Sequence, residues 1–370
     1  MPPAITREQL RQMRARSQWL SDASRSPSVG DITRQLFALQ SQEWSSAQLA
    51  IHARGRGITL ADVARVREVE RAFVLTWTLR GTLHLVPAQD LRWQLELCGP
   101  PAIRGTRSRY KQLGLTEDIR ERALAAIEDI LSAGALTRAQ LTQALGERGI
   151  PVAGQAIHHL ARFAALRGLI CLGAEVDGDL NYALLDEWLP SEALAQRPAD
   201  PPAEFARRYL AAYGPATPAD FKRWSGLGAS QVKAAWAAIA PECVPVTIPD
   251  GEALMLERQL DQLEAPTSEP TLRLLPRYDN YLLGYESRAF MVAEAFAKRV
   301  HPGGGLIRAC LLVDGEAVAN WKLEKQRAGV RVFVEPFEAL DQSLLPYLEA
   351  EVQSLGFFLD AKVELRVASS

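Results

Sequence analysis

The feature that most constrains the fold of this 370-residue chain is a repeated order of elements: short amphipathic helices precede a pair of strand-like runs. Residues 5–20, 31–40, 47–54 and 60–69 carry apolar side chains at helical spacing. Residues 73–86 are instead rich in β-branched and aromatic residues and break at Arg80-Gly81, which predicts a β-hairpin. Helices followed by a hairpin are the order of a winged helix-turn-helix.

The same order recurs twice. Helices are predicted at residues 116–133, 137–145 and 152–167, before two alternating runs in 169–185 that turn at Gly178. Three more are predicted at 204–213, 217–224 and 229–239, before a strand at 243–248. Thr137 and Thr217 cap the second helix of each group, 80 residues apart, as expected for tandem winged-helix domains joined near Asp200-Pro201-Pro202.

The pattern changes after about residue 254. Two apolar runs flank Asp314-Gly315 within residues 307–323, which is a strong hairpin signal. Strands at 330–334 and 363–367 enclose a helix at 343–355. We therefore predict a mainly α fold with β-hairpins (α+β). Its expected parts are three winged helix-turn-helix domains, at residues 1–115, 116–198 and 199–265, and a β-rich, mixed α/β domain at 266–370.

Composition excludes several classes of protein. No apolar run approaches the roughly 18–20 residues that a membrane-spanning helix needs, and no basic segment followed by an apolar stretch opens the chain. The four cysteines are scattered, which favours reduced thiols and argues against a zinc or Fe–S site. HExxH, Walker A, GxGxxG and GxSxG patterns are missing as well. We expect a cytoplasmic monomer with no metal, no cofactor and no membrane contact.

The net charge of −2 conceals an asymmetry between the two parts of the chain. Residues 1–168 carry 23 Lys and Arg against 15 Asp and Glu, a net of +8. Residues 169–370 carry 19 against 29, a net of −10. An electropositive front part suits a polyanionic partner.

Two segments of the first predicted domain could carry chemistry. Gln40 and Gln42 stand at a predicted helix end. Either they belong to a polar last turn of the helix, or the helix unwinds there and the two side chains converge on one site. Arg80, Thr82 and His84 lie in the first hairpin. They form its solvated face, or they belong to a wing whose Arg and His meet the negative potential of a DNA minor groove.

Two later segments offer candidate DNA contacts. Lys222 and Arg223 form a solvated helix face or a surface that contacts phosphates. In the run Leu275-Pro276-Arg277-Tyr278-Asp279-Asn280-Tyr281, Asp279 can cap a rigid turn. The tyrosines of that run could instead stack on a base or an abasic gap.

Taken together, these segments make the chain resemble the AlkZ/YcaQ-type winged-helix DNA glycosylases over about residues 5–365. Four pieces occur in the family's order: Gln40-Ser41-Gln42 with Ser46-Ala47-Gln48-Leu49-Ala50, Arg80-Gly81-Thr82-Leu83-His84, Leu275-Pro276-Arg277-Tyr278-Asp279, and Leu312-Val313-Asp314-Gly315 with Trp321. Arg-Gly-Thr-Leu-His is the most specific of them.

The resemblance implies three tandem winged-helix domains with a concave DNA-binding surface and a β-rich C-terminal part. It also implies an active site with a Gln-x-Gln or Gln-x-Asp motif, which aligns with Gln40 and Gln42; the middle residue, usually apolar, is Ser41 here. The Gln-x-Gln form resembles the subfamily that unhooks azinomycin-type interstrand crosslinks in antibiotic self-resistance. The expected partner is double-stranded DNA with alkylated purines or crosslinks, in the nucleoid, with Arg80, Thr82, His84, Lys222, Arg223, Arg277 and Tyr278 as DNA contacts.

Glutamines suit a restricted glycosidic chemistry. A purine alkylated at N7 or N3 is cationic and leaves as a neutral base, so the enzyme chiefly positions water and stabilises positive charge on the sugar. Amides do this but do not take up a proton at neutral pH. Glu43 is an alternative base. The nearest lysine in sequence is Lys111, which argues against a Schiff-base step.

Two other functions stay open at this stage. A non-catalytic winged-helix DNA-binding protein or transcriptional regulator fits the domain order, although regulators usually pair one reader with dimer symmetry. A resistance protein that sequesters a DNA-damaging drug is the second. Lesion-dependent abasic sites distinguish a glycosylase from the first, and binding of free drug without DNA identifies the second.

Overall fold

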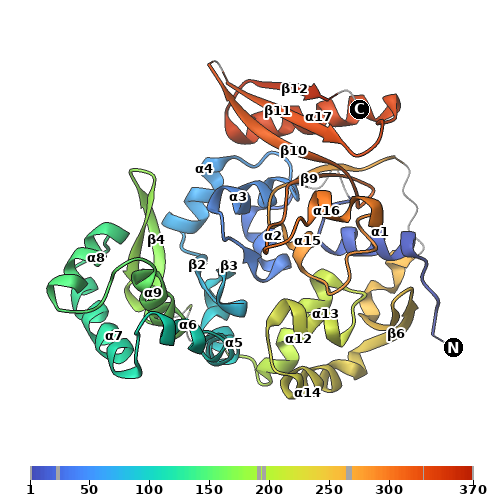
Figure 1. Cartoon of the computed structure of the whole chain (residues 1–370). Coiled ribbons are helices and arrows are strands. Elements are labelled where there is room, and N and C mark those ends of the chain that lie inside the picture. Colours follow the sequence, from blue (N-terminus) through green and yellow to red (C-terminus); the bar gives the residue numbers. More distant parts are fainter. Residues whose placement is uncertain are drawn as a thin grey trace.

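The computed structural model describes residues 2–21, 26–189, 193, 197–263, 269–327 and 329–368. Figure 1 shows helices arranged around three sheets. The chain is mixed α/β, in agreement with the predicted class. Within the described ranges, no helix combines the length and apolarity needed to cross a membrane.

The N-terminal part supplies helices and the first hairpin. Its main elements are α1 (Arg7–Ser17), α2 (Val29–Leu36), β1 (Leu39–Gln40), α3 (Trp44–His52), α4 (Leu60–Ala64), β2 (Phe73–Trp77), β3 (Leu83–Pro87), α5 (Leu91–Gly105) and α6 (Arg107–Gln112). A π-helical turn η1 (Arg65–Val69) extends α4, a 3-10 turn η2 (Leu79–Gly81) joins β2 to β3, and η3 (Ala88–Asp90) follows β3. The predicted hairpin at 73–86 is thereby confirmed.

The second group consists of α7 (Glu117–Leu131), α8 (Arg138–Glu147), α9 (Ala156–Leu166), β4 (Ile170–Val176), β5 (Asp179–Leu184) and α10 (Leu185–Trp188). The third consists of α12 (Pro201–Tyr213), α13 (Pro218–Ser225), α14 (Ala229–Ile239), η4 (Ala240–Glu242), β6 (Cys243–Ile248), β7 (Gly251–Leu256) and η5 (Glu257–Leu263). Reciprocal capping bonds between Thr137 and Gln140 and between Thr217 and Asp220 begin α8 and α13, so the two predicted Thr caps are confirmed.

The C-terminal part contains β8 (Leu272–Leu275), α15 (Asn280–Leu283), η6 (Glu294–Phe296), α16 (Ala297–Val300), β9 (Cys310–Val313), β10 (Glu316–Gln326), β11 (Gly329–Pro336), η7 (Gln342–Leu344), α17 (Leu345–Leu359) and β12 (Val363–Val367). Its sheet has the order β12-β11-β10-β9-β8. β9 and β10 form the predicted hairpin, with Asp314 and Gly315 at positive φ in the turn.

The first two predicted domains share one sheet, with the order β1-β3-β2-β4-β5. β2 joins β4 through the pair Leu75 and Leu172. The α7–α9 and α12–α14 groups flank the β2–β3 hairpin in Figure 1. The predicted division into four domains stays a prediction, and its last boundary, after residue 265, lies outside the described residues.

One predicted helix is wrong at its end. Residues 31–40 were expected to be helical, but α2 ends at Leu36 and residues 39–40 form β1. Phe37 has a φ of 65°, a left-handed conformation that stops a helix. Helices α5 and α6 have no counterpart in the sequence prediction. Pro100 and Pro101, which ordinarily interrupt a helix, lie inside α5.

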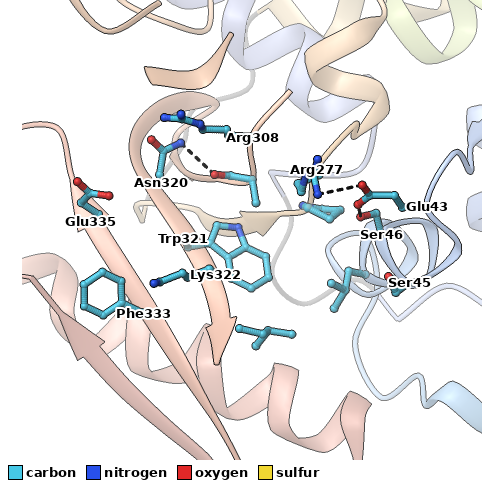
Figure 2. A pocket seen from close by; sticks show the side chains of 14 residues that line it. Glu43, Ser45, Ser46, Arg277, Arg308, Asn320, Trp321, Lys322, Phe333 and Glu335 are labelled. Atoms are coloured by element: carbon cyan, nitrogen blue, oxygen red, sulfur yellow. Dashed lines mark hydrogen bonds and ion pairs between the residues drawn. The ribbon is translucent and has the colours of Figure 1, made fainter. Parts of the chain in front are cut away.

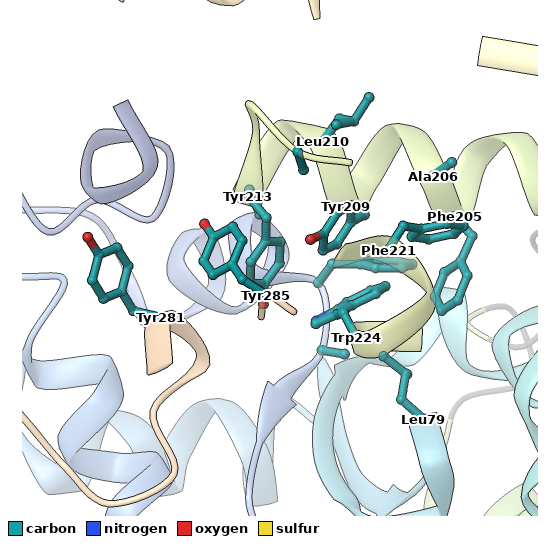
Figure 3. Close-up of a cluster of buried hydrophobic side chains, with 14 of the residues drawn as sticks. Leu79, Phe205, Ala206, Tyr209, Leu210, Tyr213, Phe221, Trp224, Tyr281 and Tyr285 are labelled. Carbon is teal, nitrogen blue, oxygen red and sulfur yellow. The ribbon is translucent and has the colours of Figure 1, made fainter. Parts of the chain in front are cut away.

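A cluster of aromatic side chains packs behind the hairpin turn (Figure 3). Its rings come chiefly from α12 and α13; they include Phe205, Tyr209, Tyr213, Phe221 and Trp224, with Leu79 of the turn. Tyr209 and Tyr213 stack with their centroids 4.9 Å apart. Aromatic burial of this kind fixes the backbone around it, so the hairpin turn is held against α13.

Candidate functional site

The Gln40-Ser41-Gln42 segment is not helical: Gln40 ends β1, and the chain bends at Gln42 before α3. After Phe37 turns the chain, Gln40 pairs with His84 in β3, and the Ser41 amide donates to the Leu83 carbonyl oxygen at 2.8 Å. Gln40 is half-buried, Ser41 is buried and Gln42 is exposed.

Ser41 fills its position without an unsatisfied hydroxyl. The Ser41 Oγ donates to the Leu39 carbonyl oxygen at 2.8 Å and accepts from the Leu85 amide at 3.1 Å. A buried hydroxyl is tolerated when it is hydrogen-bonded. The structure therefore accommodates serine at a position where the resemblance led us to expect an apolar residue.

Asn280 holds the backbone on both sides of Leu39. Its Oδ1 accepts from the Gln40 amide at 2.8 Å, and its Nδ2 donates to the Ala38 carbonyl oxygen at 2.8 Å. The same amide donates to Tyr213 of the aromatic cluster. Sequence reasoning did not select Asn280, although it directly follows the recognised Tyr278-Asp279 pair.

Asp279 fixes the position of Asn280. Its carboxylate accepts two bonds from the Arg54 guanidinium, each 2.8 Å long, and both side chains are fully buried. It also caps α15 by accepting from the Tyr281 amide at 2.8 Å. The predicted capping role of Asp279 is confirmed, and Arg54 is the partner that the sequence did not reveal.

Arg80 turns inward to Gln40. Its Nη2 donates to the Gln40 Oε1 at 3.0 Å, and its Nη1 donates to the Trp224 carbonyl oxygen. Burial, with a smaller contribution from Arg223, lowers the pKa of Arg80 to about 10, so it stays charged at neutral pH. The guanidinium thereby fixes the amide oxygen of Gln40.

His84 does not lie on a solvated face. Its side chain is only 1% exposed, and its Nδ1 is 3.0 Å from the Thr82 carbonyl oxygen. Burial, together with the charge of Arg80, lowers the pKa of His84 to about 3, so the ring is neutral at neutral pH. Because its side chain is buried, the placement of His84 does not fit a side chain that enters a DNA groove. Thr82 is half-buried, and its hydroxyl donates to Leu79.

Glu43, the residue after Gln42, lines a pocket of about 440 Å³ between α3 and the C-terminal sheet (Figure 2). At its rim the Glu43 Oε1 lies 2.9 Å from the Arg277 Nη1, and the Glu43 Oε2 accepts from Ser46 at 3.1 Å. Trp321 and Phe333 form an apolar part of the pocket wall. The Arg277 guanidinium also lies 5.2 Å from the centroid of the half-buried Tyr278 ring.

Lys222 and Arg223 are exposed on α13, the helix that contains Trp224. Neither side chain has an acidic partner within the ranges that the structure describes. They are free to meet an anionic ligand, although the structure does not bring them into contact with Gln40.

Comparisons with known proteins agree with this architecture. A family model described as "DNA glycosylase AlkZ-like" matches residues 33–358. A curated protein of Streptomyces sahachiroi, named interstrand DNA cross-link repair glycosylase, is 25% identical over 317 residues, which cover 83% of this chain and 85% of that protein. The solved structure of the Streptomyces sahachiroi DNA glycosylase AlkZ is similar with a TM-score of 0.83 and 23% identity, over 99% of this chain and all of that one.

Proposed function

Because the chain belongs to the AlkZ-like DNA glycosylase family and is a DNA glycosylase, we propose that it hydrolyses the N-glycosidic bond of purines alkylated at N7 or N3. We include purines that join the two strands of a crosslink, since the curated relative is named for crosslink repair. The partner is double-stranded DNA that carries such lesions.

The observation that carries the site assignment is the fixation of Gln40 from two directions. Asn280 holds its backbone amide, and Arg80 holds its side-chain oxygen. A dipole that is already oriented does not have to reorganise when charge develops in the transition state. Gln40 thus presents a fixed amide to the sugar, where positive charge accumulates as the base departs.

Gln42 positions water in this scheme. Its side chain is exposed and adjustable, and an amide oxygen accepts a hydrogen bond from a water molecule without taking its proton. The pair is therefore restricted to leaving groups that need no protonation, namely cationic alkylpurines. Glu43 is a weaker candidate for the base because its carboxylate is already engaged by Arg277 and Ser46.

The test is single-turnover base release from a duplex with one N7-methylguanine, repeated with an azinomycin-type crosslinked duplex. Wild type should release the base, and Gln40→Ala and Gln42→Ala should each lower the rate about 100-fold, the effect of removing one preorganised dipole. Gln143→Ala, at an exposed position on α8, is the matched control and should behave as wild type. Retention of DNA without release from either duplex would instead indicate a binding protein.

A further inference from the structure

Arg80 also lines a second pocket, of about 430 Å³, formed by α5, α6, α9 and the turn after α13. Arg109 of α6, Arg162 and His159 of α9, and Thr106 lie around it. No Asp or Glu is among its described lining residues. The pocket is therefore a cluster of positive charge that adjoins the Gln40 site through a shared arginine.

Arg80 and Arg162, which are largely buried, and Arg109, which is half-exposed and donates to the side-chain oxygens of Gln112 and Gln155, all lack an acidic partner within the described residues. By contrast, the buried Arg54 pairs with Asp279. Burial lowers the pKa of Arg162, as it does that of Arg80. Charges that are partly removed from water without a partner favour the binding of an anion.

Two nitrogen atoms at the pocket also lack partners within the described part of the chain. They are the Nε of Arg162 and the Nδ1 of His159, whose residue is 9% exposed. A buried polar atom without a hydrogen bond is unfavourable. An anion with several acceptor oxygens would satisfy such atoms together with the guanidinium forks, whose geometry matches a phosphate.

Two glycines allow the arginines to converge. A Cβ at Gly81, where φ is +65°, would lie 1.9 Å from the Arg162 Nη2, and a Cβ at Gly226, where φ is +74°, would lie 2.8 Å from the Arg80 Cγ. Any side chain at Gly81 would therefore displace Arg162. Gly81 of the Arg-Gly-Thr sequence thus permits both the hairpin turn and the position of Arg162 in the pocket.

The pocket is connected to Gln40 by hydrogen bonds. Arg162 donates to the Thr106 Oγ1 at 2.9 Å and to the Arg80 carbonyl oxygen at 3.4 Å. The side chain of Arg80 in turn donates to Gln40. We propose that this pocket binds a backbone phosphodiester of the DNA strand close to the lesion. The inference rests on DNA binding by this glycosylase and is independent of which glutamine acts in the chemistry.

The experiment measures the affinity of the full-length protein for a duplex with a tetrahydrofuran abasic-site analogue over a range of KCl concentrations. Arg109→Gln and Arg162→Gln should each weaken binding about tenfold at 0.1 M salt and reduce the slope of log K against log salt by about 1. Arg148→Gln is the control, because Arg148 is exposed and pairs with Asp129. Arg109, which is half-exposed, should be replaceable without loss of folding.

A scan of the duplex with single neutral methylphosphonate linkages locates the phosphate. At one linkage the tenfold difference between wild type and Arg109→Gln should disappear, and Gln40→Ala should retain that pattern even if it abolishes base release. Unchanged affinity and slope in both arginine variants, or no linkage that removes the difference, would overturn the proposal. Thermal stabilisation of the DNA-free protein by inorganic phosphate with unchanged DNA affinity would likewise overturn it, in favour of a small-anion site.

Discussion

The two glutamines of the motif are the same residue type two positions apart, yet they lie in different surroundings. On the inner side, Gln40 is held by Arg80 and Asn280, and Asn280 directly follows Asp279 of the buried Arg54–Asp279 pair. On the outer side, Gln42 is exposed beside Glu43 and Arg277, which are 35% and 43% exposed. We therefore expect the inner side to be rigid and the outer side to be adaptable, and mutations on the two sides should differ in kind.

The largest difference is expected in stability. Asp279→Asn leaves the Arg54 charge buried without its partner and should lower the free energy of unfolding by about 3–5 kcal/mol. Glu43→Gln makes the same chemical change in a solvent-screened pair and should lower it by less than about 1 kcal/mol. Urea unfolding of both variants measures this, and similar losses would contradict the division into a rigid and an adaptable side.

The second difference concerns replacement of each glutamine by aspartate. Gln42→Asp should release N7-methylguanine at nearly the wild-type rate, since a carboxylate oxygen at this exposed position still accepts a hydrogen bond from water. Gln40→Asp should be about 100-fold slower, because a shorter, charged side chain disrupts the bond from Arg80. Single-turnover rates at saturating enzyme provide the measurement, and the reverse order of rates would exclude Gln40 as the fixed member.

The third prediction compares two glycines with positive φ. Gly178→Ala places no atom within 4 Å of the new Cβ. It should lower the free energy of unfolding by about 1 kcal/mol, the cost of a left-handed backbone in a residue with a side chain. Gly81→Ala should cost about 2 kcal/mol in unfolding experiments, because it also displaces Arg162. It should weaken DNA binding as well, whereas equal behaviour of the two variants would remove the role of Arg162.

The last prediction concerns pH. The folded-state pKa of His84 is about 3, below its ordinary value of 6.5. Below pH 6.5, His84 is therefore protonated in the unfolded chain but stays neutral in the folded protein. This difference lowers the free energy of unfolding progressively as the pH falls from 6.5 toward 3. Between pH 7 and 5.5, His84→Gln should reduce the fall in unfolding free energy by about 1.3 kcal/mol. An unchanged fall would mean that His84 is not buried in its neutral form.

Much of the fold follows from local signals in the sequence. The Thr137 and Thr217 caps, the β2–β3 hairpin and the Asp314-Gly315 turn depend on residues that are close in the chain. The end of α2 was missed because Phe37 adopts a left-handed backbone that aromatic residues rarely take, in a position where its ring packs into the aromatic cluster.

The site itself was only partly predictable. Asn280 meets Gln40 across 240 positions and Arg54 meets Asp279 across 225, and contacts of such range leave no periodic trace in the sequence. Alternation along a strand predicts which residues share a face of the sheet, but not which elements cover that face. His84 was therefore placed wrongly, and the inward direction of Arg80 became visible only with the fold.

The most direct test of the central claim is a double-mutant cycle between Gln40→Ala and Arg80→Met in single-turnover release of N7-methylguanine, with enzyme in saturating excess so that DNA affinity does not enter. If Arg80 acts by fixing Gln40, Arg80→Met alone should slow release about tenfold, in line with the loss of one charge-assisted hydrogen bond, and should have no further effect once Gln40 is alanine. Multiplicative losses in the double variant would contradict the claim, because the two residues would then act independently.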